Sequence, residues 1–288
     1  MTSKDSAAPS VLSEHRFVSF DKTPIFFRTL KPAEQPAKAL LVIVHGMAEH
    51  GGRYLPLAEY LAALGVVSYL PDLRGFGQSG GKRGCLEKFS DYYQDLAVVQ
   101  RIARERENFE QLFFLAHSYG GLVISCFLAE NKDVPAKGLI LSSPNFGIGI
   151  PVPAWRQGLA FLASKVLPDY TQSNRVNPVF LTHDLEICNQ HAKDPLIHDR
   201  ISARLYTELL SQISQIDKTA SKIRTPSLIL QAGDDRIVSR ESTSRFFKYL
   251  AAEDKELEIL DGLYHEILNE ISRYSLFHKI STWLLDRA

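Results

Sequence analysis

The stretch FFLAHSYGGLVI (residues 113–124) decides the fold. The apolar run before His117 predicts a buried strand, and the run after Gly120 predicts a buried helix. Ser118 stands at the turn between them, as in the G-x-S-x-G motif, where a tight turn presents a serine hydroxyl at the carboxyl end of a sheet. Ala116 takes the first glycine position and Gly120 the second, so both neighbours are small. A serine that caps a helix would fit the same turn, and the motif alone leaves both interpretations open.

Strand and helix patterns alternate on both sides of this stretch. Continuous apolar strands are predicted at 38–44, 66–71, 111–116, 138–144, 226–232 and 256–260, with helices at 54–65, 91–106, 120–130, 242–252 and 275–287 and a hairpin at 15–20 and 24–30. Continuous apolar strands separated by helices are typical of a mostly parallel sheet that is covered on both faces. The fold class predicted is therefore α/β.

The alternation is interrupted once. Residues 146–222 offer helical segments and no convincing strand, which predicts a helical cap inserted into the sheet domain. We therefore expect a disordered leader at residues 1–12, the first part of the core at 13–145, the cap at 146–222 and the second part of the core at 223–288.

A serine nucleophile needs a base and a group that orients the base, and in this kind of fold they follow in the order Ser, Asp, His. The strand at 226–232 is followed by Asp234 and Asp235, and the next strand is followed by His265. A capping aspartate or a surface histidine would be unremarkable alone, but the ordered set predicts a triad. Only one of the two aspartates can orient the imidazole, and their spacing does not decide between them.

A developing oxyanion needs two backbone N–H donors. The residue after the nucleophile, Tyr119, is expected to supply one, and Met47, in the loop HGMAEHGGRY after the strand at 38–44, the other. His45 in the same loop is expected to be a structural hydrogen-bonding residue.

Composition excludes several classes of protein. Lys+Arg and Asp+Glu both number 33, so there is no basic excess for a nucleic-acid partner. The three cysteines are scattered, which favours a reducing compartment without disulfides. The N-terminus lacks a signal-peptide pattern, and no apolar run reaches the roughly 18 residues of a membrane span. We expect a cytoplasmic protein.

Two further patterns are interpreted as structural. Residues 75–80, GFGQSG, match a dinucleotide fingerprint, but the acidic strand end that such a site requires about 20 residues later is missing. The histidines and aspartates at 183–199 match no metal-ligand spacing. The prediction is that no cofactor and no metal are required.

HGMAEHGGRY, PDLRGFGQSGG, AHSYGG, Asp194-Pro195-Leu196, GDDRIV and YHEILNE together resemble the monoacylglycerol lipase and lysophospholipase group of the α/β-hydrolases. The resemblance runs from about residue 13 to the C-terminus. It implies Ser118 as nucleophile, His265 as base and Asp235 as orienting acid, because the family's aspartate directly precedes the basic residue of its motif, here Arg236. Tyr119 stands where many members carry methionine.

The resemblance implies a hydrolase of lipid esters, with monoacylglycerol or lysophospholipid as substrate. An esterase, amidase or acyltransferase using the same triad is the first alternative, and a non-catalytic binding protein of the same fold is the second. The cap sequence AWRQGLAFLASKVLP is apolar enough to suggest that Leu159 and Leu162 contact an acyl chain or a membrane surface, although packing of the cap onto the core would also explain it. The oligomeric state is left open.

Overall fold

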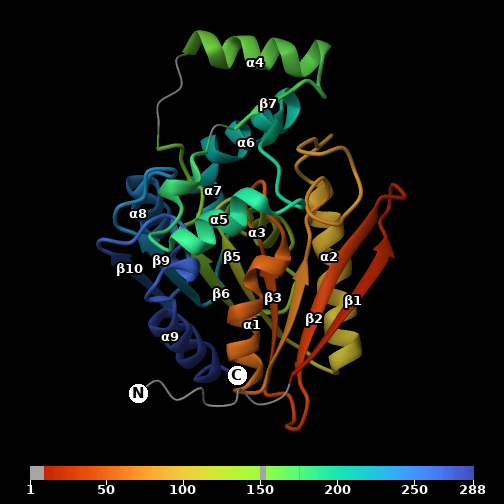
Figure 1. The fold of residues 1–288 in the computed structure, drawn as a ribbon, viewed down its shortest axis with the longest axis vertical. Helices are drawn as coiled ribbons and strands as arrows, with labels where there is room; N and C mark the ends of the chain where they lie inside the picture. Colours follow the sequence, from red (N-terminus) through yellow and green to blue (C-terminus); the bar gives the residue numbers. More distant parts are fainter. Residues whose placement is uncertain (1–9, 150–153, 175) are drawn as a thin grey trace.

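The computed structural model describes residues 10–149, 154–174 and 176–288, which build an eight-stranded sheet with helices on both faces (Figure 1). The strand order is β1-β2-β4-β3-β5-β6-β9-β10. β2 is antiparallel to both of its neighbours, β1 and β4, and the other described pairs of this sheet are parallel. The strands are β1 (Ser10–Val18), β2 (Pro24–Pro32), β3 (Ala39–Val44), β4 (Val66–Pro71), β5 (Leu112–His117), β6 (Ala136–Ser142), β9 (Ser227–Ala232) and β10 (Lys255–Leu260).

The central strands are buried on both faces because alternate side chains enter two separate cores. Val42 and Val44 of β3 belong to the core that contains the apolar residues of α2, α3 and α8. Leu41 and Ile43 belong to the core on the other face, under α1 and α9. This confirms the predicted mostly parallel, doubly covered sheet. The helices are α1 (Leu55–Ala62), α2 (Asp91–Glu107), α3 (Tyr119–Glu130), α8 (Arg240–Tyr249) and α9 (Arg273–Leu285), with short 3₁₀ turns η1 (Gly51–Tyr54) and η3 (Ile267–Asn269).

The segment between β6 and β9 stands above the carboxyl ends of the strands (Figure 1). It contains α4 (Ala154–Val166), β7 (Thr171–Ser173), η2 (Pro178–Phe180), α5 (Leu185–Lys193), β8 (Arg200–Ser202), α6 (Ala203–Ser214) and α7 (Ile216–Ala220). It contacts the loops after β3 and β10, because His50 Nε2 lies 2.8 Å from Asp194 Oδ2 and the Glu266 N–H donates to the Leu181 carbonyl.

Two predictions about the chain's organisation need correction. The first strand begins at Ser10, so residues 10–12 of the expected leader are ordered against β2; residues 1–9 lie outside the described part. The inserted segment holds two strands, β7 and β8, which pair with each other and are too short to show a period-2 pattern in sequence. The limits 146–222 for the cap stay a prediction, and α7 packs against α3 and α8 of the core.

The glycine-rich turn at 75–80 serves the geometry of neighbouring loops. Gly77 has φ +49, and a methyl group there would lie 2.2 Å from the carboxylate of Asp72 and 2.8 Å from His50 Cβ. The turn therefore passes close to the loop after β3, which agrees with a structural role for this pattern. Cys85, Cys126 and Cys188 are all free thiols, which agrees with the expected absence of a disulfide framework.

Candidate active site

Ser118 occupies a strained turn between β5 and α3. Its φ of +50 and ψ of −118 lie in a region that non-glycine residues rarely adopt. The turn is enforced by close packing, because a methyl group at Gly120 would lie 2.4 Å from the His45 carbonyl oxygen and 2.5 Å from that of Val44. Ala116 is fully buried. The requirement for a very small residue two positions after the serine, read from the motif, is therefore confirmed.

The three predicted polar residues lie in one hydrogen-bonded row. The Ser118 hydroxyl lies 2.8 Å from His265 Nε2, and His265 Nδ1 lies 2.7 Å from Asp235 Oδ2. Ser118 and His265 are 8% and 3% exposed. These residues come from the loops after β5, β9 and β10, which end at the same edge of the sheet because the strands are parallel.

The structure separates the two adjacent aspartates. The Asp235 side chain is fully buried, and its Oδ1 accepts the N–H groups of Ile237 and Val238 over 2.9 and 3.0 Å. Asp234 is exposed. The geometry therefore pairs Asp235, and not Asp234, with His265.

The pKa shifts of Asp235 and His265 both favour a charged carboxylate next to a basic imidazole. Burial favours protonation of Asp235, yet the charge and hydrogen bond of His265 hold the pKa of that carboxyl below its usual value. Burial likewise opposes protonation of His265, but the carboxylate of Asp235, with smaller contributions from Glu266 and Glu49, raises the pKa of the imidazole. An ionised Asp235 beside a basic His265 is the arrangement that general-base catalysis needs.

A second imidazole beside this row stays neutral. The His117 ring lies 4.8 Å from that of His265, and its Nδ1 faces the carbonyl and hydroxyl of Ser142 at 3.0 and 3.1 Å. Burial, followed by repulsion from His265, lowers the pKa of His117 to about 4. Of the two adjacent imidazoles, His265 is therefore the one that binds a proton more readily.

Met47 and Tyr119 stay a prediction as oxyanion donors, and the structure brings the segments that carry them next to the serine. Tyr119 is the first residue of α3, so its N–H has no partner inside the helix. The loop after β3 approaches from the other side, because a methyl group at Gly46 would lie 3.3 Å from Ser118 Cβ, and Met47 follows directly. His45 anchors this loop as expected, with Nδ1 facing the Gly46 carbonyl and Nε2 accepting the N–H of Leu73.

Leu159 and Leu162 lie apart from this row. Both are on α4 at the outer end of the cap, and they are 58% and 59% exposed. The histidines of the cap have structural contacts instead: His183 stacks on Tyr264, and His198 stacks on Phe76. Within residues 10–149, 154–174 and 176–288, no group of three or more His, Cys, Asp or Glu side chains is placed to hold a metal.

Sequence reasoning missed a buried set of charges next to His265. Arg53 donates to Glu49 and to both oxygens of Glu266, and Tyr54 donates to Glu49 over 2.7 Å. The signal available in the sequence was the presence of three charged residues, Glu49, Arg53 and Glu266, in the motifs HGMAEHGGRY and YHEILNE. The other residues of these motifs are mostly buried.

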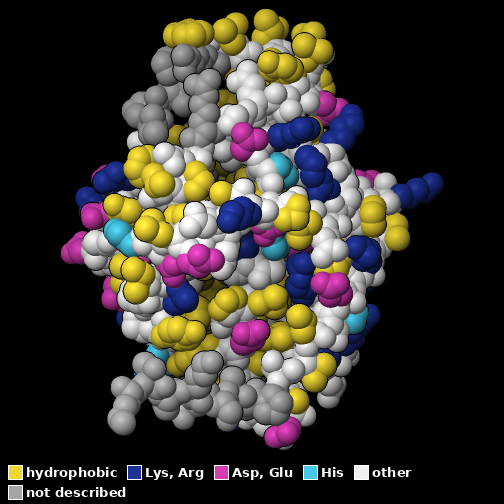
Figure 2. All heavy atoms as spheres, in the orientation of Figure 1, with side chains coloured by type: hydrophobic (Ala, Val, Ile, Leu, Met, Phe, Trp, Pro, Cys, Tyr) yellow, Lys and Arg dark blue, Asp and Glu magenta, His cyan; other side chains and the backbone are white. Residues whose placement is uncertain are grey.

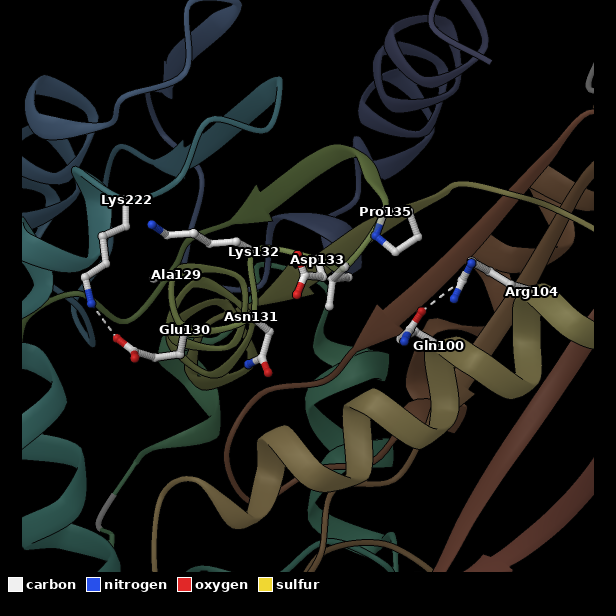
Figure 3. Close-up of a pocket in the computed structure, with 10 residues that line it drawn as sticks. Gln100, Arg104, Ala129, Glu130, Asn131, Lys132, Asp133, Pro135 and Lys222 are labelled. Atoms are coloured by element: carbon white, nitrogen blue, oxygen red, sulfur yellow. Dashed lines mark hydrogen bonds and ion pairs between the residues drawn. The ribbon is translucent and has the colours of Figure 1, made fainter.

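A hollow in the described part of the chain lies away from Ser118 (Figure 3). It measures about 610 Å³ and is lined by residues at the last turn of α3, including Glu130, which pairs with Lys222 over 2.6 Å. Since α3 begins directly after Ser118 and rises about 1.5 Å per residue, the hollow is on the order of 18 Å from the serine. It has no contact with the triad.

Comparison with known proteins gives a consistent set of relatives. A family model described as "Serine aminopeptidase, S33" matches residues 35–272. The chain is 30% identical to monoglyceride lipase of Homo sapiens over 94% of this chain and 89% of that protein. It is 32% identical to phospholipase YtpA of Bacillus subtilis over 85% of this chain and 94% of that protein. Two other relatives are longer: the chain spans 46% of the uncharacterised Escherichia coli protein YnbC and 29% of an uncharacterised abhydrolase domain-containing protein of Dictyostelium discoideum.

Solved structures agree with the fold. The monoacylglycerol lipase of Paleococcus ferrophilus superposes with a TM-score of 0.81 at 28% identity, over 96% of this chain and all of that one. The Saccharomyces cerevisiae monoglyceride lipase, solved with a substrate analog, gives 0.86 at 20% identity, over 99% and 98% of the two chains. The second likeness shows the fold alone. No helix in the described part of the chain is long and apolar enough to cross a bilayer.

Proposed function

The chain belongs to the α/β-hydrolase family described as serine aminopeptidase, S33, and from this premise we propose that it hydrolyses carboxylic esters of single-chain lipids. The observation that carries the proposal is the row from Asp235 through His265 to Ser118, with contacts of 2.7 and 2.8 Å. The relatives named for an activity are monoglyceride lipases and a phospholipase, which favours an acylglycerol or a lysophospholipid as substrate.

In the proposed reaction, His265 takes the Ser118 proton while the serine oxygen attacks the ester carbonyl. The N–H groups of Met47 and Tyr119 stabilise the oxyanion, and removing one such donor costs about 3 kcal/mol in barrier. His265 then protonates the departing alcohol, which leaves an acyl-Ser118 ester. Water deprotonated by His265 attacks that ester, releases the fatty acid and restores the serine.

A hydrolysis assay tests the proposal. Release of fatty acid from a monoacylglycerol and from p-nitrophenyl butyrate is expected for the wild-type chain, with Ser118→Ala as the blank. An aminoacyl anilide serves as the comparison, because the family description also names an aminopeptidase activity. Cleavage of the anilide alone would replace lipid ester hydrolysis with amide hydrolysis, and cleavage of no substrate above the blank would overturn the proposal.

The cap supplies an apolar surface for the lipid. Five apolar side chains of α4 and that of Leu167, the residue after the helix, are more than half exposed. Figure 2 shows hydrophobic side chains gathered at that end of the molecule. Packing of these residues onto the core, the alternative for this stretch, is therefore wrong. We propose that this surface contacts the aggregated lipid from which the substrate is drawn. The residues are Trp155, Leu159, Phe161, Leu162, Val166 and Leu167.

Leu159→Asp and Leu162→Asp are expected to reduce hydrolysis of long-chain monoacylglycerol presented in vesicles about tenfold each. A charge on the apolar surface opposes its burial in lipid, where each buried apolar side chain contributes about 1.5–3 kcal/mol. Hydrolysis of dissolved p-nitrophenyl butyrate is expected to stay unchanged. Val18→Asp, at a still more exposed position at the end of β1, is the control. Equal losses on both substrates would contradict a role for this surface in lipid contact.

A further inference from the structure

β1 forms one edge of the sheet. Among the described strands it pairs with β2 and with no other, and Figure 1 shows it at the border of the molecule. Its nine residues contain no proline, and they pair with β2 without a bulge, from Ser10 opposite Pro32 to Val18 opposite Pro24. Short length, proline and bulges commonly protect an edge from a further strand. Since β1 has none of these three features, its edge can accept another strand.

The exposed side chains along β1 include two apolar and two charged groups. Leu12 and Val18 are 48% and 70% exposed. Between them lie Glu14 and Arg16, which are also exposed, although Glu14 lies 3.5 Å from Arg28 of β2. Because alternate side chains of a strand point to the same face, these four groups line one face of the edge. A strand that pairs with β1 would bring its own side chains against them.

A second copy of the chain fits this edge best in one register. Two identical strands that pair antiparallel are related by a two-fold axis, so the residue on the axis fixes the register. With His15 on the axis, Glu14 of one copy lies opposite Arg16 of the other, and Leu12 lies opposite Val18. With Glu14 or Arg16 on the axis, like charges would lie opposite each other, which is destabilising. Pairs of opposite charge and pairs of apolar side chains both favour the register centred on His15.

The residue on this axis does not oppose the pairing. The His15 ring stacks on Phe27 of β2 with ring centroids 5.1 Å apart. Burial, followed by the charges of Arg106 and Lys31, lowers the pKa of His15. The two imidazoles that meet at the axis are therefore uncharged at neutral pH.

The opposite edge of the sheet lacks this match. β10 has six residues, and Glu258 is paired with Lys279 of α9 over 2.5 Å. A two-fold axis at Glu256, Leu257 or Glu258 would in each case place acidic side chains opposite each other. Like charges in that position disfavour pairing, so β1 is the edge that suits a second copy.

We propose that two copies of this chain associate by antiparallel pairing of their β1 strands, centred on His15, so that the two sheets join into one. The contact is narrow, since it involves little more than one strand from each copy. Small interfaces of this kind are weak, and we expect a dissociation constant on the order of 10 µM. The inference is independent of the proposed ester hydrolysis.

The pairing leaves the candidate active site free. Ser118 follows β5, which is separated from β1 by β2, β4 and β3. The two-fold axis reverses the strand direction, so the two caps lie at opposite ends of the joined sheet, with each α4 surface away from the contact. Hydrolysis is therefore expected to be the same in monomer and dimer. Val18→Asp, although it lies on this edge, stays a valid control for lipid contact.

Sedimentation velocity of the full chain tests the inference, at protein concentrations from about 1 to about 200 µM, which bracket the expected dissociation constant. The wild-type chain is expected to pass from monomer to dimer. Arg16→Glu brings two carboxylates together at each charged pair, and Glu14→Arg brings two guanidinium groups together. Each single variant is expected to associate at least tenfold more weakly.

An equimolar mixture of the two variants is the decisive sample. Each charged pair between the two different chains again joins a carboxylate to a guanidinium, so a heterodimer is expected with about the wild-type dissociation constant. Arg224→Glu reverses a charge in the exposed segment before β9, near the other edge of the sheet, and is expected to dimerise like the wild-type chain. If Glu14→Arg lacks the wild-type circular dichroism, Glu14→Lys takes its place with the same expectation.

Three results would overturn the inference: a wild-type chain that stays monomeric at the highest concentration, association that is unchanged in Arg16→Glu, and a mixture that associates no better than its two components. The first would mean that the edge stays unpaired. The second would place the contact on another surface, and the third would rule out the register centred on His15.

Discussion

Alanine at Ser118 is expected to lower kcat for ester hydrolysis on the order of 10⁶-fold, and alanine at His265 to lower it by a similar factor. The serine oxygen and His265 Nε2 lie 2.8 Å apart, so either change removes the same step, the transfer of the serine proton to the imidazole. The double variant is therefore expected to be no slower than either single variant. Steady-state hydrolysis of p-nitrophenyl butyrate measures all three.

Covalent labelling separates a lost nucleophile from lost folding. A fluorophosphonate is expected to label the wild-type chain at Ser118 and to leave Ser118→Ala unlabelled. Ser125→Ala, seven residues later and inside α3, is the control that should keep both labelling and activity, since the Ser125 hydroxyl donates to the Gly121 carbonyl of the same helix. Losses that multiply in the double variant, or a label retained in Ser118→Ala, would contradict the triad.

Asp235→Asn is expected to lower kcat about 10⁴-fold, whereas Asp234→Asn should change it less than twofold. The buried Asp235 carboxylate lies 2.7 Å from His265 Nδ1, fixes the tautomer of the ring and stabilises the imidazolium that forms. Asp234 is exposed. The two variants remove the same charge at adjacent positions, so the comparison isolates the contact with His265. Similar losses in both variants would mean that the substitutions act by disturbing the turn after β9, and not through the contact with His265.

The same substitution should change the pH profile. His265 acts as a base only when neutral, and Asp235 is the main group that raises its pKa, so the acid limb of kcat/KM should have its midpoint above about 6.5 in the wild-type chain. In Asp235→Asn the pKa of His265 falls and the limb should move to lower pH. A limb that moves to higher pH, or not at all, would be inconsistent with this pairing.

The turn at Ser118 between β5 and α3 could be predicted from sequence because it depends only on residues close together in the chain. A strand, a serine between small residues and a buried helix follow one another within about a dozen positions, and each leaves its own pattern. The choice of Asp235 over Asp234 was not decided by spacing, since it depends on how the turn after β9 directs two neighbouring side chains. The backbone N–H groups of Ile237 and Val238 settle that direction in the fold.

The buried set of charges formed by Glu49, Arg53 and Glu266 could not be predicted from local sequence patterns. Arg53 and Glu266 are 213 residues apart, and each charge alone resembles a solvated side chain. The apolar character of α4 was visible in the sequence, but its exposure was not, because a helix with this pattern would look the same if it were packed against the core. The three-residue strands β7 and β8 were too short to give any periodic signal.

The distance along the chain between the parts of this site has a consequence for how the molecule folds. Ser118 meets His265 across 147 residues, and His265 follows β10, the last described strand along the chain. Contacts between residues so far apart form slowly, because the entropy of closing long loops must be overcome before they contribute stability. A chain emerging from the ribosome therefore cannot assemble the row of side chains until β10 and His265 after it have been made. Hydrolysis should therefore recover, after dilution from denaturant, with the same time course as the completion of the whole core. A probe of local helix formation should not show this time course.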